Sequence, residues 1–146
     1  NSIILKHRIN IGVAVASDAG LVVPVIHDTD LLDVAGLAVA VDDLAGRVRD
    51  GKLSLSDVQD STFTINNTGV FGSVIGKPLI NPPEAAIMNT EAVIKRPVVI
   101  DDEIVVRSIM NLCLTFDHRV LDGAEAGAFL QSVKSRLESF DSDNIV

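Results

Sequence analysis

Hydrophobic and polar residues alternate along the first part of the chain in the pattern of β-strands. Strict alternation over residues 9–16 predicts one strand, and residues 21–26 are predicted to pair with it as a hairpin around a turn at 17–20. Pro24 lies within the second strand and indicates an edge or a bulge, because proline cannot donate to a strand ladder.

Two other segments repeat apolar residues at helical spacing. The first extends from Leu31 to about Arg49, behind capping aspartates at positions 28 and 30, with Gly51 as its stop signal. The second extends from residue 123 to about residue 139. Because strands and hairpins are combined with only two long helices, the sequence predicts an α+β fold.

The rest of the chain also divides into short elements. Strands are predicted at residues 62–65, 85–94 and 109–116, with a hairpin over 98–106 and a short helical turn at 54–57. Residues 66–83 are rich in Gly, Pro and Asn, and they predict a long loop. A loop of that length in a compact domain is usually functional.

Composition narrows the classes of function. The 146 residues suit one domain, and 47% hydrophobic with 22% charged residues is ordinary globular usage. Twelve basic and 20 acidic residues give a net charge of −8, which disfavours a nucleic-acid partner. The sequence has no apolar run of a membrane span and no Cys/His spacing of a metal site. Cys113, the single cysteine, is expected in the core of a protein from a reducing compartment.

The residues that can carry chemistry gather in one string, Asp-His-Arg-Val-Leu-Asp-Gly at positions 117–123, where a strand gives way to a helix. A histidine titrates near neutral pH, so His118 is a candidate general base. Asp122 is a candidate for orienting the ring or anchoring the loop, and Gly123 permits a tight entry into the helix. From residue types alone, a structural histidine is the stronger interpretation.

The whole string changes this balance, because it resembles the catalytic motif of the dihydrolipoamide acyltransferases. These are the core components of the 2-oxo acid dehydrogenase complexes, and they are related to chloramphenicol acetyltransferase. Further blocks match that family in order and spacing, at residues 9–16, 20–25, 63–69, 80–87 and 95–99. The resemblance continues to about Glu138, and it implies that residues 1–140 are the later and larger part of the catalytic domain.

The resemblance implies both a fold and a reaction. The fold is a mixed β-sheet packed with two long helices, as in chloramphenicol acetyltransferase. The reaction moves an acyl group between the thiol of dihydrolipoyl and the thiol of CoA, which are substrates, with no tightly bound cofactor and no metal. His118 takes the proton from the attacking thiol, and Asp122 holds the loop through an ion pair.

Asn66 departs from the family pattern. In many members a Ser or Thr follows Phe-Thr-Ile and donates a hydroxyl to the oxyanion, whereas Asn66 offers an amide N–H. Asn67 and Thr68 are implied to contact substrate, and the alternative for Asn66 and Asn67 is a turn that caps the strand. The Asn-Asn-Thr sequence resembles the branched-chain acyltransferases more than the acetyl or succinyl types.

The resemblance also implies an assembly. The family forms trimers with active sites between subunits, so His118 and Asn66 are expected to meet across an interface and not within one chain. Lipoyl domains and the dehydrogenase components are the expected partners, in the cytoplasm or in the mitochondrial matrix of a eukaryote. Residues 141–146 are a tail whose apolar Ile145 and Val146 either anchor a larger hollow core or form a disordered end.

Three functions stay open on the sequence. The start at Asn1 and the absence of the family's first segment indicate an N-terminally truncated chain. The leading hypothesis is an acyltransferase, whose site is incomplete if the absent segment lines the substrate channel. The second hypothesis is a trimeric assembly scaffold without chemistry of its own. The third is acetylation of an antibiotic, which the Asn-Pro-Pro-Glu-Ala block at 81–85 disfavours.

Overall fold

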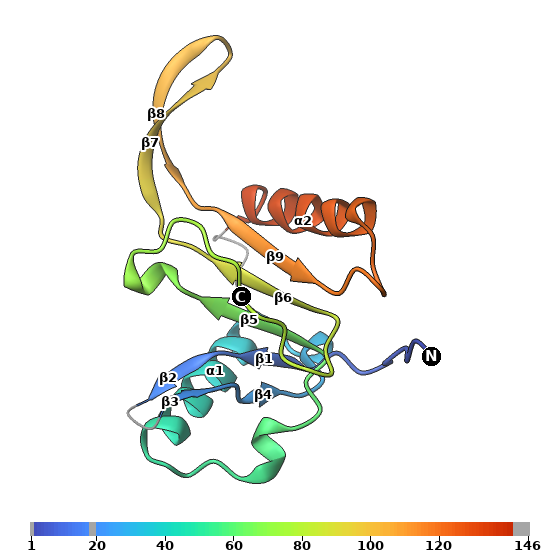
Figure 1. The fold of residues 1–146 in the computed structure, drawn as a ribbon. Coiled ribbons are helices and arrows are strands. Elements are labelled where there is room, and N and C mark those ends of the chain that lie inside the picture. Colours follow the sequence, from blue (N-terminus) through green and yellow to red (C-terminus); the bar gives the residue numbers. More distant parts are fainter. Residues whose placement is uncertain (1, 18–19, 142–146) are drawn as a thin grey trace.

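A five-stranded mixed sheet forms the centre of the molecule in the computed structural model, which describes residues 2–17 and 20–141 (Figure 1). The strand order is β4-β1-β5-β6-β9. β1, β5 and β6 are parallel, while β4 and β9 are antiparallel edge strands. The five strands are β1 Ile11–Val13, β4 Val25–Ile26, β5 Phe63–Asn67, β6 Ala86–Thr90 and β9 Leu112–Phe116.

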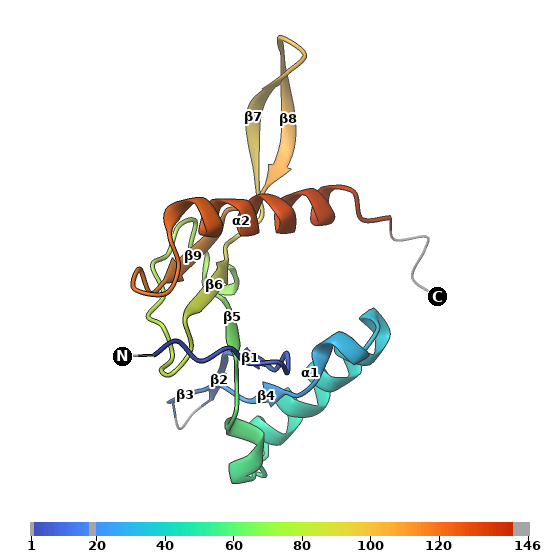
Figure 2. The same cartoon turned by 90° about the vertical axis from the view of Figure 1, so that its right-hand side faces the viewer.

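Two hairpins and two long helices complete the fold. The first hairpin joins β2 (Val15–Ser17) to β3 (Gly20–Val22), and the second joins β7 (Ile94–Ile100) to β8 (Glu103–Ile109). The β7–β8 hairpin projects away from the sheet in both views (Figures 1 and 2). The helices are α1 (Val34–Arg49) and α2 (Gly123–Glu138), with short 3₁₀ turns η1 (Thr29–Leu31), η2 (Leu55–Val58) and η3 (Gly69–Phe71). The predicted α+β class, a mixed sheet with two long helices, is confirmed.

Helix α2 covers one face of the sheet beside β9, and α1 lies at the β1–β4 side (Figure 2). Phe129 of α2 meets Phe63 of β5 edge to face, with ring centroids 5.7 Å apart and planes at 61°. Such an aromatic pair stabilises the contact by about 0.5–1.5 kcal/mol beyond its buried area. This contact ties α2, which follows the candidate catalytic string, to the centre of the sheet.

The strands near the N-terminus are shorter than predicted. The strand expected over residues 9–16 breaks at Ala14 into β1 and β2, and the one expected over 21–26 breaks at Val23 and Pro24 into β3 and β4. Pro24 has no N–H, but its carbonyl accepts from Val13 N–H at 2.8 Å. Because β4 is the edge of the sheet, the edge predicted from Pro24 is confirmed. Part of the predicted turn, residues 18 and 19, lies outside the described residues.

Helix α1 begins later than its apolar stripe predicts. The prediction that Asp28 and Asp30 cap this helix is wrong. Asp28 has a left-handed backbone (φ 49°), and Leu32 is extended, so the chain is not yet helical there. Asp33 is the cap, and its carboxylate accepts from Gly36 N–H at 2.7 Å. Gly51 is confirmed as the stop: it has φ +65°, and the N–H groups of Gly51 and Lys52 close the last turn on Val48 and Arg47.

The later strands also differ in their bounds. The strand expected over 85–94 ends at Thr90, and residues 94 and 109 belong to the β7–β8 hairpin instead. The loop expected from residue 66 begins later, because Asn66 and Asn67 pair with Asn89 and Thr90 inside the sheet. The short helical turn at 54–57 is confirmed as η2, with a capping box between Ser54 and Asp57.

Two features are absent from the described residues. None of their helices is long and apolar enough to cross a membrane. In the same residues, no three side chains of His, Cys, Asp or Glu are grouped as a metal ion requires.

Candidate functional site

His118 lies in the tight turn that follows β9. Asp117 begins this turn: its N–H donates to the Ala85 carbonyl at 2.8 Å, and its carbonyl accepts from the N–H groups of Val120 and Leu121. The His118 ring is exposed and lies 5.5 Å, centroid to centroid, from the Phe116 ring. No hydrogen bond joins the His118 ring to another described residue, so both ring nitrogens are open to a ligand.

Asp117 and Arg119 brace the backbone on both sides of His118. The Asp117 carboxylate accepts from the Arg119 backbone N–H at 2.9 Å and from its guanidinium at 2.6–3.1 Å. The Arg119 side-chain hydrogen bonds, then its backbone N–H, lower the pKa of Asp117 to about 2. Asp117 is therefore ionised throughout the neutral range and holds the turn rather than exchanging protons with His118.

Asp122 holds the next part of the turn as the N-cap of α2. Its Oδ1 accepts from the N–H groups of Ala124 and Glu125 at 2.8 and 2.9 Å, and Glu125 Oε2 accepts from Asp122 N–H at 3.0 Å. This reciprocal pair is a capping box. The expected ion pair is not present among the described residues of this chain; instead, the Asp122 carboxylate anchors the loop by satisfying helix N–H groups.

Asn66 lies near the other end of the sheet, on β5. The register places Asn66 beside Asn89, and Asn89 beside Cys113, in one row across β5, β6 and β9. Directly paired residues point to the same face of a sheet, so these three side chains share a face. The half-buried Asn66 amide makes no hydrogen bond to another described residue, which leaves its N–H groups available as donors.

Asn67 and Thr68 are engaged in the structure of the strand end. Asn67 Oδ1 accepts from Gly69 N–H at 2.9 Å, which is the strand-capping turn proposed as an alternative for the Asn pair. Thr68 Oγ1 donates to Glu91 Oε2 at 2.8 Å and accepts from Asn89 Nδ2 at 2.9 Å. The Thr68 hydroxyl proton is thus directed to a carboxylate and not to a ligand.

The sheet register keeps His118 and Asn66 apart within one chain. Asn66 is level with Cys113 at the start of β9, whereas Phe116 at its end is level with Ala86 at the start of β6. Three residues of strand advance roughly 10 Å, and His118 lies beyond Phe116. The two side chains also stand two strands apart, at about 4.8 Å per strand. A single chain therefore does not bring His118 and Asn66 into one site.

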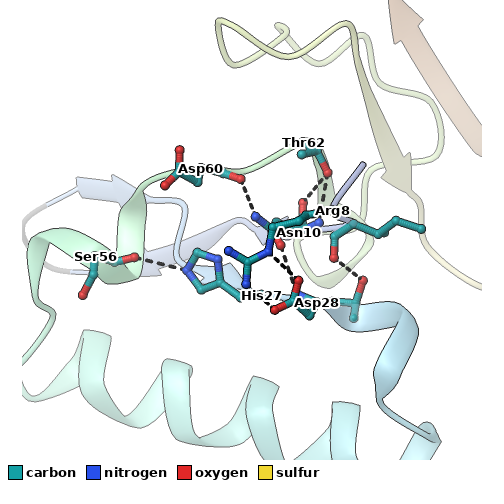
Figure 3. Close-up of polar contacts among 9 residues, drawn as sticks. Arg8, Asn10, His27, Asp28, Ser56, Asp60 and Thr62 are labelled. Carbon is teal, nitrogen blue, oxygen red and sulfur yellow. Dashed lines mark hydrogen bonds and ion pairs between the residues drawn. The ribbon is translucent and has the colours of Figure 1, made fainter. Parts of the chain in front are cut away.

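A polar cluster not foreseen from the sequence surrounds Asn10 at the His118 end of the sheet (Figure 3). Asn10 is 2% exposed, and its amide accepts from Asp28 N–H at 2.9 Å and donates to the Asp60 carbonyl at 2.8 Å. Asn10 therefore joins three chain segments and holds two left-handed residues, Asp28 and Asp60.

Two further contacts lie beside Asn10. Asp28 forms an ion pair with Arg8, and the exposed His27 has its Nε2 3.3 Å from the Ser56 carbonyl.

Two buried glutamates were also missed by sequence reasoning. Glu84 accepts from Thr64 Oγ1 at 2.8 Å, and Glu91 accepts from Thr68, so each carboxylate binds a threonine at one end of β5. The sequence does hold one sign of Glu91: the polar residues 89–91 interrupt a segment that is otherwise apolar.

Fold and site together define an α+β protein with an exposed histidine on a braced strand-to-helix turn, and comparison with known proteins specifies the family. The model of the 2-oxoacid dehydrogenases acyltransferase catalytic domain matches residues 1–143, and the chain belongs to this family. The lipoamide acyltransferase component of the Bacillus subtilis branched-chain alpha-keto acid dehydrogenase complex is 50% identical over all of this chain and 35% of its own length. A succinyltransferase component from Bartonella vinsonii is 45% identical over 93% of this chain and 33% of its own length. The chain thus spans about a third of these relatives.

Solved structures show the same fold. A probable dihydrolipoamide acetyltransferase from Listeria monocytogenes superposes with a TM-score of 0.95 at 48% identity, over 99% of this chain and 62% of that one. The dihydrolipoamide acetyltransferase of Azotobacter vinelandii superposes with a TM-score of 0.91 at 34% identity, over 94% and 57%. A serine, a histidine and an asparagine of that enzyme were investigated for their catalytic role. The serine lies 52 positions before the histidine and the asparagine four after it; the same intervals separate Asn66, His118 and Asp122.

Proposed function

We propose that this chain transfers an acyl group between a dihydrolipoyl thiol and the thiol of CoA, as the core of a 2-oxo acid dehydrogenase complex. The observation that carries the proposal is His118, exposed on a turn that Asp117 and Asp122 brace from both sides. Family membership supports the reaction class, and the two matching intervals in the Azotobacter enzyme support Asn66, His118 and Asp122 as its site.

In this reaction a neutral His118 accepts the proton of the attacking thiol. A free thiol has a pKa near 8.5, so removal of its proton by a neighbouring base yields the thiolate that attacks the thioester carbonyl. The carbonyl oxygen becomes an oxyanion, for which the Asn66 amide N–H is the donor. The tetrahedral intermediate then expels the second thiolate, and the proton on His118 returns to it. Asp122 acts by positioning the turn, and Asn67 and Thr68 by shaping the donor strand.

The proposed site lies between two subunits of a trimer. Because the register separates His118 from Asn66 within a chain, each site combines His118 of one protomer with Asn66 of the next. A heterologous contact of this kind closes into a ring under three-fold symmetry. Trimers of this type are the units from which a larger cage would assemble.

Branched-chain acyl groups are the proposed substrates. The 50% identical branched-chain relative and the 45% identical succinyltransferase differ by little, so the preference depends on the Asn66-Asn67-Thr68 sequence. Lipoyl domains and the dehydrogenase components are the proposed partners, and the cytoplasm or the mitochondrial matrix is the proposed location.

The test is acyl transfer from isobutyryl-CoA to dihydrolipoamide, compared with succinyl-CoA, on this chain and on any longer protein that carries it. His118→Ala should lower kcat by at least about 100-fold, because it removes the general base. His27→Ala, which changes an exposed histidine outside the site, is the control and should retain activity. Equal activity of wild type and His118→Ala would contradict the mechanism, and faster succinyl transfer would contradict the acyl preference.

A scaffold without chemistry of its own is the second candidate, and it shares with the trimeric enzyme a large surface for other chains to cover. The chain exposes 10346 Å², whereas a compact monomer of 15.5 kDa exposes roughly 7,200 Å². This excess suits a protein that is covered by other chains. A trimer without acyl transfer in any longer protein that carries the chain would favour the scaffold over the enzyme.

A further inference from the structure

Thr68, Asn89 and Glu91 form a hydrogen-bonded network near Asn66, and Asn89 and Glu91 have no part in the reaction proposed above. Asn89, which pairs with Asn66 across the sheet, is 1% exposed, and Glu91, two residues further along, is 3% exposed. Asn89 Nδ2 donates to Glu91 Oε1 at 3.0 Å and to Thr68 Oγ1 at 2.9 Å. Glu91 therefore accepts hydrogen bonds from two residues near Asn66. Thr68 lies two positions further along the chain, and Asn89 lies opposite Asn66 in the sheet.

The carboxylate fixes the direction of each hydrogen bond. An ionised carboxylate only accepts, so the Thr68 hydroxyl must donate to Glu91, and its lone pair must face Asn89 Nδ2. Both hydrogens of that amide are then used, and the buried Asn89 Oδ1 stays an acceptor without a partner among the described residues. The network therefore has one arrangement, and its member Asn89 is the partner of Asn66 in the sheet register.

Further hydrogen bonds and the close packing of Gly76 hold the Glu91 carboxylate in place. Hydrogen bonds from Ser73, then from Thr68, Asn89 and Cys113, keep the pKa of Glu91 below its ordinary value although burial opposes this. Gly76 covers the carboxylate: a Cβ there would lie 2.6 Å from Asn89 Nδ2 and 2.8 Å from Glu91 Oε1. Glu91 is thus a fixed, charged group that neither titrates in the neutral range nor reaches solvent.

We propose that Glu91 is a positioning residue for acyl transfer, which orients the Asn66 amide toward the oxyanion by holding Thr68 and Asn89. This inference rests on the proposed function, because it assigns Asn66 the role of oxyanion donor. Preorganised donors are effective because they need not reorient as the charge develops. Glu91 supplies this preorganisation without contacting the substrate, because it fixes Thr68 and Asn89 beside the Asn66 amide.

The test is a set of kinetic comparisons in the oligomeric enzyme. Removing an oxyanion donor costs about 10²–10³ in kcat, so Asn66→Ala should fall in that range. Glu91→Gln should lower kcat by roughly 10- to 100-fold, with KM for both thiols and the pH profile unchanged, because the new amide N–H would donate to Thr68 Oγ1 and turn away the hydroxyl proton that the carboxylate accepts. In the Asn66→Ala background, Glu91→Gln should cause no further loss, since its effect passes through Asn66.

Glu84→Gln is the matched control, because Glu84 is also buried and also accepts a hydrogen bond from a threonine, Thr64 of β5, but no hydrogen bond joins it to Asn89 in the described residues. Whatever loss it causes should persist in the Asn66→Ala background. If Glu91→Gln does not fold, Gly76→Ala serves instead, since its methyl group displaces the same two side chains.

The outcomes distinguish failure of the positioning role of Glu91 from failure of the proposed acyl transfer. A folded Glu91→Gln enzyme with kcat within about twofold of wild type, or a loss that multiplies with that of Asn66→Ala, overturns the positioning role alone. Full activity in His118→Ala and Asn66→Ala overturns the proposed function and the positioning role together.

Discussion

Two aspartates hold the turn around His118 by different physical means. Asp117 uses charge and a bidentate guanidinium, and Asp122 uses the unpaired N–H groups at the start of α2. Arg119 is 89% exposed, so solvent screens its ion pair, whereas the cap of Asp122 is made of short-range hydrogen bonds. The two contributions therefore respond to different changes in conditions.

Arg119→Gln should raise the pKa of Asp117 from about 2 toward the ordinary value of about 3.9. The sign follows from the lowered pKa: the stabilisation is complete above the unfolded value, and it is lost as the pH falls through the folded value near 2. A ¹³C NMR titration of the side-chain carboxyls measures the shift. Lys134→Gln, which removes the cation of an exposed pair with Glu138, should leave the pKa of Asp117 unchanged. A pKa that stays near 2 in Arg119→Gln would contradict the assignment.

Asp122→Ala should lower the free energy of unfolding by about 1 kcal/mol, because it removes the cap of α2. For a domain of this length the shift in Tm is roughly 2–4 °C. Asp122→Asn should retain the Tm, since asparagine caps helices as well as aspartate does. Thermal unfolding by circular dichroism measures both variants, and an equal loss in Asp122→Asn would show that the charge, and not the cap, holds the turn.

At the scale of elements, the connections between strands depend on Asn10. It accepts from the turn before η1 and donates to the turn before β5, and both turns contain an aspartate with positive φ. A non-glycine residue in that region is strained unless its surroundings hold it. The amide of Asn10 supplies that support to both turns at once.

Asn10→Ala should therefore lower the free energy of unfolding by about 2–3 kcal/mol, since it leaves two backbone groups without partners. Urea unfolding followed by circular dichroism gives the value. Ser17→Ala is the control: its hydroxyl donates to Gly20 on the surface, and the change should stay within about 0.5 kcal/mol. A loss of less than about 1 kcal/mol in Asn10→Ala would show that the turns hold themselves.

Periodicity predicted the type of most elements but misplaced several of their ends. The stripe that begins at Leu31 is compatible with a longer α1, yet the left-handed Asp28, held by Asn10 from another segment, delays the helix to Val34. Likewise, Asn66 and Asn67 have loop-like residue types but are recruited into β5 by pairing with β6. The motif singled out His118 and Asp122 as candidates, whereas the contacts of Glu91 with distant residues are encoded by no local pattern.

At the scale of the whole molecule, the proposed active site belongs to the assembly and not to the chain. His118 and Asn66 lie at opposite ends of one sheet, so each protomer would contribute to two different sites. A defect in either residue would then disable one of the two sites in which a protomer takes part.

Mixing two inactive variants should therefore restore activity. When His118→Ala and Asn66→Ala subunits exchange at random in equal amounts, about a quarter of the interfaces combine an intact His118 with an intact Asn66. The acyl-transfer rate should rise to about a quarter of the wild-type rate, as measured after reversible dissociation with exchange verified by native mass spectrometry. The same mixture before dissociation is the control. No recovery after verified exchange would place the site within one chain.

The projecting β7–β8 hairpin has a consequence for the order of folding. Its strands are joined by Asp101 and Asp102, whose positive φ values of 50° and 63° suit a tight turn with the strand twist. Pairing of Ile100 with Glu103 closes almost no loop, whereas β1 finds β5 only when Ile11 meets Phe63. Hairpins form within about 1–10 μs, and non-local parallel pairing is slower. The topology therefore favours a chain in which the β7–β8 hairpin forms and reforms early. The sheet that contains Asn66, and that positions His118 through the turn after β9, is completed last.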